Sequence, residues 1–144
     1  MAKVLHSTNC FNTLIRVAED CPAQHGEEPQ PRGGQPTVAV LQFRMIAGAP
    51  YKYTSDDVVF ATSAAGRALD AKTAKKERSL ARETFFSRGQ ACMRASPLGK
   101  RFGWGVHADA EGRIAIYAVD SKRYQALARD PEIAQTRAMR SKRV

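Results

Sequence analysis

The chain has 144 residues, a net charge of +9, 43% apolar residues and 26% charged residues. These values are typical of one globular domain, and they exclude a wholly disordered chain and a second sizeable domain. No apolar run approaches the roughly 20 residues of a membrane-spanning helix, and residues 1–10 lack the apolar core of a secretory signal. We therefore expect a cytoplasmic protein with no membrane partner.

The positive charge is concentrated in the middle of the chain and at its end. Residues 72–101 carry nine basic and two acidic side chains, and residues 129–144 carry five and two. Such surfaces attract polyanions and anionic metabolites. The alternative is a basic face that is simply solvated, because charge runs also keep proteins soluble.

The first part of the chain predicts a strand, a loop and a helix. Residues 12–18 alternate in the manner of a strand. Residues 23–36 contain three prolines and three glycines and predict a surface loop. Thr37 then caps a helix that ends near Gly48.

Two further helices are predicted in the middle of the chain. Thr54 or Ser55 caps the first, which continues to about Leu69, with a strand at residues 58–61 as the competing interpretation. Residues 77–86 fit the second. Its inward face is expected to carry Leu80, Ala81, Thr84 and Phe85.

Residues 103–119 form the clearest pattern, two strands around a glycine-containing loop at residues 109–112. Val106, Ile114 and Ile116 are expected to share one face of this hairpin. A short helix over residues 122–128 follows, capped by Ser121, with Tyr124 and Leu127 facing inward. Residues 133–144 are expected to be a frayed helix or disordered.

Together these elements predict an α+β fold, because strands and helices are segregated and lack regular βαβ alternation. We expect a single compact domain at residues 1–128, with a small antiparallel sheet packed by three to four short helices. Residues 23–36 are its surface loop, and residues 129–144 form a basic C-terminal tail.

Residues 85–107 are the segment most suited to a binding site. Its glycines let the backbone approach a ligand, and its arginines can grip a carboxylate or phosphate. A turn-rich connection with Trp104 in the core is the structural alternative. The ligand-binding candidates are Ser87, Arg88, Gln90, Arg94, Ser96, Lys100, Arg101 and Trp104.

Catalytic candidates are fewer, and each has a structural alternative. Cys92 lies near arginines that lower a thiol pKa, and His107 would be its base, but a buried cysteine is also expected here. Asp56 and Asp57 suit acid–base chemistry, metal ligation or capping of a helix N-terminus. His107 is alternatively a solvated histidine on the exposed face of a strand.

The motifs that define metal and nucleotide sites are missing. The three cysteines form no CxxC pair, the histidines are widely spaced, and the glycines match neither a P-loop nor a dinucleotide fingerprint. We therefore predict reduced thiols, no metal and no cofactor.

The order of several motifs carries a resemblance. AEDCP, YTSDD, SRGQACMRASPL and GWGVH together resemble a family of small bacterial and fungal proteins known only as a domain of unknown function. The resemblance extends from about Asn9 to Leu127, with Ala91 in place of proline and Arg88 in place of lysine. It implies no activity and supplies no catalytic residue.

Three functions fit the sequence. The first is a binding module for a small anionic ligand, and the second is an enzyme using Cys92 or Asp56/Asp57 with His107. The third is a nucleic-acid accessory protein acting through its basic surface, for which no reading motif is present.

Overall fold

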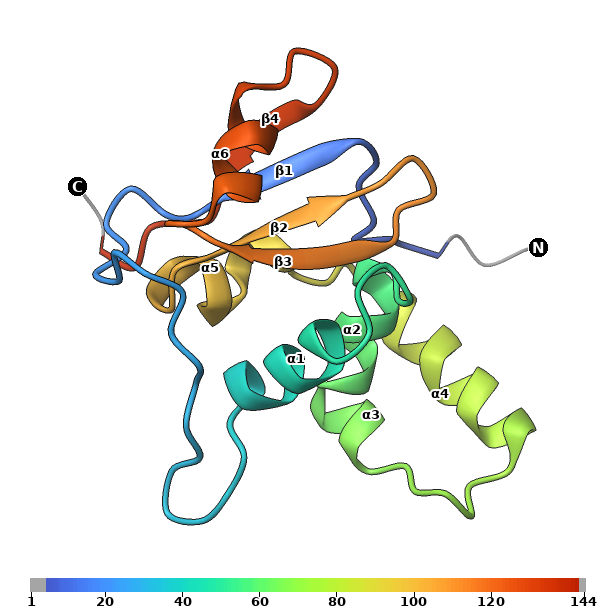
Figure 1. Cartoon of the computed structure of the whole chain (residues 1–144). Helices are drawn as coiled ribbons and strands as arrows, with labels where there is room; N and C mark the ends of the chain where they lie inside the picture. The colour runs from blue at the N-terminus through green and yellow to red at the C-terminus, as the bar shows by residue number, and fades with distance from the viewer. Residues whose placement is uncertain (1–4, 143–144) are drawn as a thin grey trace.

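The computed structural model describes residues 5–142, folded as one α+β domain around a four-stranded sheet (Figure 1). The first four residues of the N-terminal segment, predicted to contain no secretory signal, lie outside the described residues. So do the last two residues of the basic tail. None of the described helices is long and apolar enough to cross a bilayer.

The sheet has the strand order β3-β2-β1-β4. β1 (Thr13–Arg16) lies antiparallel to β2 (Trp104–Ala108), which forms the predicted hairpin with β3 (Ile114–Ala118). β4 (Ala134–Arg137) pairs with β1 in parallel, so the sheet is mixed. The α+β class and the single compact domain are thus confirmed, with one parallel strand added to the antiparallel sheet.

β4 corrects the expectation of a frayed helix or disorder over residues 133–144. Its sequence, AQTR, lacks the apolar alternation of a half-buried strand. The strand forms through its backbone: Ala134 N–H donates to the Asn12 carbonyl and Ala138 N–H to the Arg16 carbonyl, each at 2.8 Å. The pairing with β1, which is distant in sequence, therefore makes these residues a strand, and no local sequence pattern predicts it.

Most of the helices between β1 and β2 begin at polar caps. Thr37 caps α1 (Val38–Ala47), as predicted, and its hydroxyl accepts from the Val40 N–H. Thr54 caps α2 (Ser55–Ala61), so the competing strand at residues 58–61 is wrong. The predicted helix to Leu69 is interrupted, because Ser63 caps a separate short helix, α3 (Ala64–Arg67).

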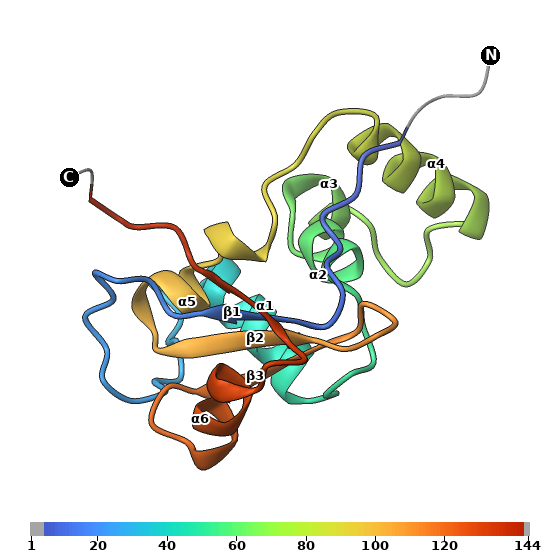
Figure 2. The ribbon, with the colours of Figure 1, turned by 90° about the horizontal axis from the view of Figure 1, so that it is seen from above.

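Helix α4 (Lys75–Phe86) stands at the edge of the domain, next to α2 and α3 (Figure 2). Leu80 is 61% exposed and Thr84 is also exposed, so the predicted inward face is wrong at both positions. Phe86 is the buried residue of this helix. The helix packs by its C-terminal end, and its first two turns have no sheet beneath them.

The two faces of the sheet have different covers. α1, α2, the 3₁₀ turn Met93–Ala95 and α5 (Pro97–Arg101) pack on one face, where Ile46, Leu98 and Val106 form the main core. α6 (Lys122–Arg129) covers the other face with Tyr124 and Leu127, as predicted.

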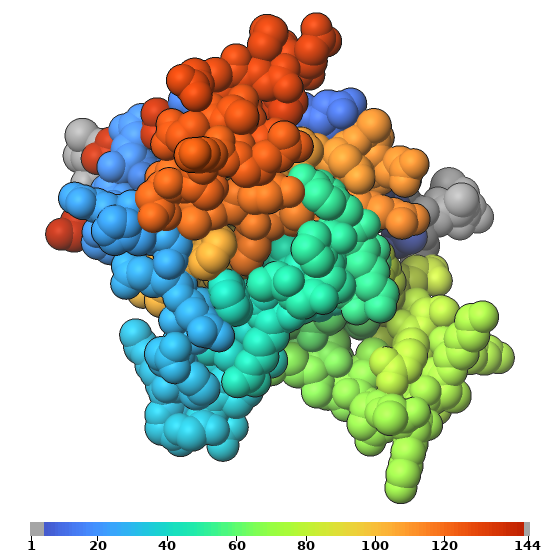
Figure 3. Space-filling view, in the orientation of Figure 1, coloured from blue at the N-terminus to red at the C-terminus, as the bar shows by residue number. Residues whose placement is uncertain are grey.

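The space-filling view shows how the covering elements leave the surface hollowed. The loop of residues 23–36 and the α3–α4 region form two lobes at the lower edge, with α1 between them (Figure 3). The candidate site lies under this part of the fold.

Gly103 tests how tightly the loop of residues 23–36 packs on the hairpin. Gly103 has φ +79°, and a Cβ there would collide with the backbone carbonyl of His25. Gly34 has φ +77° but open space around it, so it provides a matched control. We expect Gly103→Ala to lower the free energy of unfolding by about 1–3 kcal/mol more than Gly34→Ala, since only the first adds overpacking to backbone strain. Urea unfolding followed by Trp104 fluorescence measures the difference, and equal effects would contradict it.

Candidate functional site

A cavity of about 260 Å³ lies between α1, α2 and the segment that leads into α5. We call it the Gln42 cavity. Seven of its lining residues belong to the predicted binding segment, residues 85–107, and three of these are predicted site residues: Gln90, Cys92 and Ser96. Among the described residues that line it, none is charged. Its full lining is Val38, Gln42, Val59, Thr62, Ser63, Phe85, Gln90, Ala91, Cys92, Ala95, Ser96 and Pro97.

The side chain of Gln42 is the polar centre of one wall. Only 6% of Gln42 is exposed, so its amide needs partners within the protein. Its Nε2 donates to the Thr62 hydroxyl at 3.3 Å, and its Oε1 accepts from the Ser96 hydroxyl at 2.6 Å. Thr62 in turn donates to the Val58 carbonyl. This chain of bonds fixes the amide plane and leaves the second hydrogen of Nε2 without a described acceptor.

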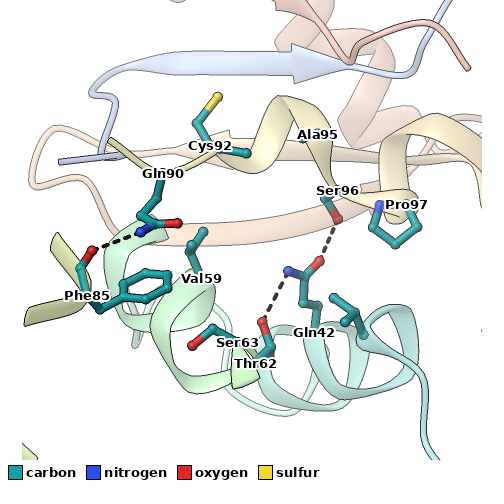
Figure 4. A pocket seen from close by; sticks show the side chains of 12 residues that line it. Gln42, Val59, Thr62, Ser63, Phe85, Gln90, Cys92, Ala95, Ser96 and Pro97 are labelled. Atoms are coloured by element: carbon teal, nitrogen blue, oxygen red, sulfur yellow. Dashed lines mark hydrogen bonds between the residues drawn. The ribbon is translucent and has the colours of Figure 1, made fainter. Parts of the chain in front are cut away.

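The side chain of Gln90 faces Gln42 from the opposite wall (Figure 4). Its Nε2 donates to the Phe85 carbonyl at 2.8 Å, which orients the amide. Its Oε1 points toward the middle of the cavity, and no donor to it is described. The cavity therefore presents a donor on one side and an acceptor on the other, with apolar side chains between them.

Cys92 lines the same cavity, but its sulfur points away from Gln42 and Thr62 (Figure 4). Burial raises the pKa of the Cys10 thiol, and the nearby Cys92 raises it further. Neither thiol hydrogen-bonds a histidine in the described chain. Among residues 5–142, Cys92 therefore has no hydrogen-bonded base that would activate it as a nucleophile.

The predicted cations do not gather in the Gln42 cavity. Arg94 donates to the Arg137 carbonyl at 2.7 Å and so fastens the end of β4. Arg101 lines a neighbouring cavity with Arg32. Arg88 is exposed beyond the end of α4, and Lys100 is half-buried in α5.

Two other predicted ligand-binding residues serve the fold. The Ser87 hydroxyl donates to the Thr84 carbonyl at the C-terminal cap of α4. Trp104 donates from Nε1 to the Glu27 carbonyl, and its ring meets the ring of Phe43 edge-on at 5.3 Å. Both contacts match the structural alternative for this segment.

Asp56 and Asp57 are both engaged in structural hydrogen bonds. Asp56 accepts from the Thr8 backbone and hydroxyl at 2.6 and 2.7 Å, and from the Ser7 hydroxyl at 2.8 Å. Asp57 completes a capping box with Thr54 and pairs with Arg82 at 2.7 Å. Burial raises the pKa of Asp57, but the bonds from Thr54 and Arg82 outweigh it and hold that pKa below its usual value. The helix-capping alternative fits Asp57, whereas the carboxylate of Asp56 binds Ser7 and Thr8 of the N-terminal segment.

Asp56 fastens the N-terminal segment to α2, and this role can be measured. In Asp56→Asn, an amide group would face the Thr8 donors, so we expect a loss of about 1–3 kcal/mol in the free energy of unfolding. Asp120 is exposed, and Asp120→Asn is the control, with a smaller expected loss. Chemical denaturation compares the two. Equal losses would show that the buried hydrogen bonds of Asp56 stabilise the fold no more than the exposed contacts of Asp120.

His107 lies on the α6 face of the sheet and is 9% exposed, so the expectation of a solvated histidine is wrong. Its Nδ1 is 2.7 Å from the Tyr51 hydroxyl, which is also 2.8 Å from the Tyr117 hydroxyl. Burial lowers the pKa of His107, and the positive charge of Arg123 lowers it further. Burial and the bond with Tyr117 raise the pKa of Tyr51.

Tyr51 reaches this network from an unusual backbone position. Its φ is +59°, a left-handed conformation that a bulky residue adopts only when its surroundings enforce it. Its N–H donates to the Ile114 carbonyl at the edge of β3. The side chain then passes around that edge to the α6 face. Tyr51 therefore anchors the turn between α1 and α2 to the sheet.

The lowered pKa of His107 predicts a pH effect on stability. His107 binds a proton more readily in the unfolded chain than in the folded chain. The free energy of unfolding is therefore at its full value above about pH 6.5, and it decreases as the pH falls through the folded pKa of His107. We expect His107→Gln to flatten this dependence between pH 7 and 5. Unfolding free energies at each pH provide the measurement. A His107 ring whose pKa, measured by NMR, lies above about 6.5 would contradict the prediction.

Gln42 and Tyr51 are the residues that sequence reasoning undervalued. Gln42 follows Val38 by four residues and precedes Ile46 by four, so it lies on the apolar stripe of its helix. A polar residue on such a stripe is the available signal of a buried network. No sequence pattern reveals the left-handed backbone conformation of Tyr51.

A family described as a family of unknown function, DUF6157, matches residues 5–144. The chain belongs to this family. The resemblance drawn from the motifs is thereby confirmed at the level of the family. No curated protein and no solved structure matches the chain.

Proposed function

We propose that this member of the DUF6157 family is a binding module for a small organic molecule, held in the Gln42 cavity. The observation that carries the proposal is the pair of facing amides. Gln42 offers an N–H and Gln90 offers a carbonyl oxygen, and each is already oriented by another hydrogen bond. Such pre-oriented groups bind at a lower entropic cost than mobile ones.

The size and lining of the cavity define the part of the ligand that enters it. Its volume of about 260 Å³ lies just below the usual range of about 300–1,000 Å³ for small-molecule sites. Val38, Val59 and Phe85 provide apolar surface beside the two amides. We infer a compact neutral group that carries both a hydrogen-bond acceptor and a donor, as an amide does.

The other candidate functions have less support. For an enzyme, His107 would have to act with Cys92 or an aspartate, yet its described partner is Tyr51. A nucleic-acid role draws only on the net charge of +9. The three free thiols suit a reducing compartment, so we infer a cytoplasmic location.

The proposal can be tested with N-acetylvalinamide, a neutral probe with two amide groups, titrated into the labelled protein by NMR. We expect shifts of the side-chain amide signals of Gln42 and Gln90. Gln90→Met, which keeps the length of the side chain and removes its polar end, should weaken binding about fivefold, as expected for one hydrogen bond.

Gln125→Met is the matched control, because the Gln125 amide also makes one bond to a backbone carbonyl and lies on α6. It should leave the affinity unchanged. Shifts confined to other surfaces, or equal affinities in the two variants, would refute the proposed site.

A further inference from the structure

A second cavity, of about 240 Å³, continues from the Gln42 cavity along the start of α1. We call it the Arg32–Arg101 cavity. Val38 and Pro97 line both cavities, so the two share a wall. Pro97 lies beside Gln42 at the end of the first cavity (Figure 4). The rest of the lining is Gln30, Arg32, Thr37, Ala39, Arg101 and Phe102.

All charged side chains among the described residues that line the second cavity are positive. Arg32 and Arg101 line it, and no acidic side chain does. Neither arginine belongs to an ion pair described for residues 5–142. Two guanidinium groups beside one cavity repel each other, and an anion between them relieves that repulsion.

An acid on the far side of Arg101, Asp20, already has hydrogen-bond partners of its own. Arg101 also borders a third cavity, which Asp20 lines. The Asp20 carboxylate accepts from the backbone N–H groups of Ser141 and Lys142 at 2.9 Å each. No ion pair between Arg101 and this carboxylate is described for residues 5–142.

The backbone of α1 adds to the positive character of this cavity. The N–H groups of Val38 and Ala39 open the helix, and no acceptor for either is described. The first turn contains no acidic residue. These groups reinforce the two arginines but are secondary to them.

We propose that the Arg32–Arg101 cavity binds an oxyanion group of the same molecule whose neutral part occupies the Gln42 cavity. This inference rests on the proposed function and specifies its ligand class: a small carboxylate or phosphate with an amide-like body. The arginines hold the charged end, and the facing amides of Gln42 and Gln90 hold the neutral end.

The test compares N-acetylvaline with N-acetylvalinamide, which differ only in the carboxylate. At low salt we expect N-acetylvaline to bind about tenfold more tightly and to shift the backbone signals of Val38 and Ala39. Arg32→Gln with Arg101→Gln should remove this tenfold preference and leave the affinity for N-acetylvalinamide unchanged. Inorganic phosphate should shift the same two signals if the cavity also accepts a phosphate.

The control removes the same charge from elsewhere on the surface. Arg88→Gln with Arg129→Gln should keep the preference for N-acetylvaline, since neither residue lines the cavity. Equal affinities of the two probes in the native protein would overturn the oxyanion site and leave the Gln42 cavity standing. Binding of N-acetylvaline at Val38 and Ala39 without any shift at Gln42 or Gln90 would instead refute the shared ligand. Absence of shifts with both probes would refute both proposals.

Discussion

The buried amide of Gln42 imposes a constraint on which the candidate site depends. An amide that is removed from water costs free energy unless its hydrogen-bonding groups find partners. Thr62 and Ser96 supply these partners from the end of α2 and from the cap of α5. Three segments far apart in the sequence thus converge on one side chain, and the cavity is the space that they enclose.

The opposite face of the sheet supports this arrangement through Tyr51. The hydroxyl of Tyr51 lies between His107 and Tyr117, while its backbone pairs with the edge of β3. The strain of its left-handed backbone, about 1–3 kcal/mol, is offset by these contacts. Because Tyr51 joins α1 to α2, the network on one face holds in position the helices that bound the cavity on the other.

Much of the local structure was predictable because its causes are local. The hydroxyls of Thr37 and Thr54 cap the helices that follow them, and the glycine at position 112, with φ +81°, allows the hairpin turn. The predictions failed where a distant partner decides the outcome. β4 depends on the free edge of β1, and Leu80 is exposed because none of the described elements covers the start of α4.

The sequence by itself determined the α+β class, the helix caps, the hairpin and the family, since each depends on side chains close together along the chain. It also indicated Gln90 and Ser96 as polar residues of a glycine-broken segment. Only the tertiary structure decided that these two face Gln42, that Arg101 joins Arg32, and that His107 meets Tyr51. Such pairings arise when packing brings separate elements together, and the distance between two side chains in space is not encoded in their distance along the chain.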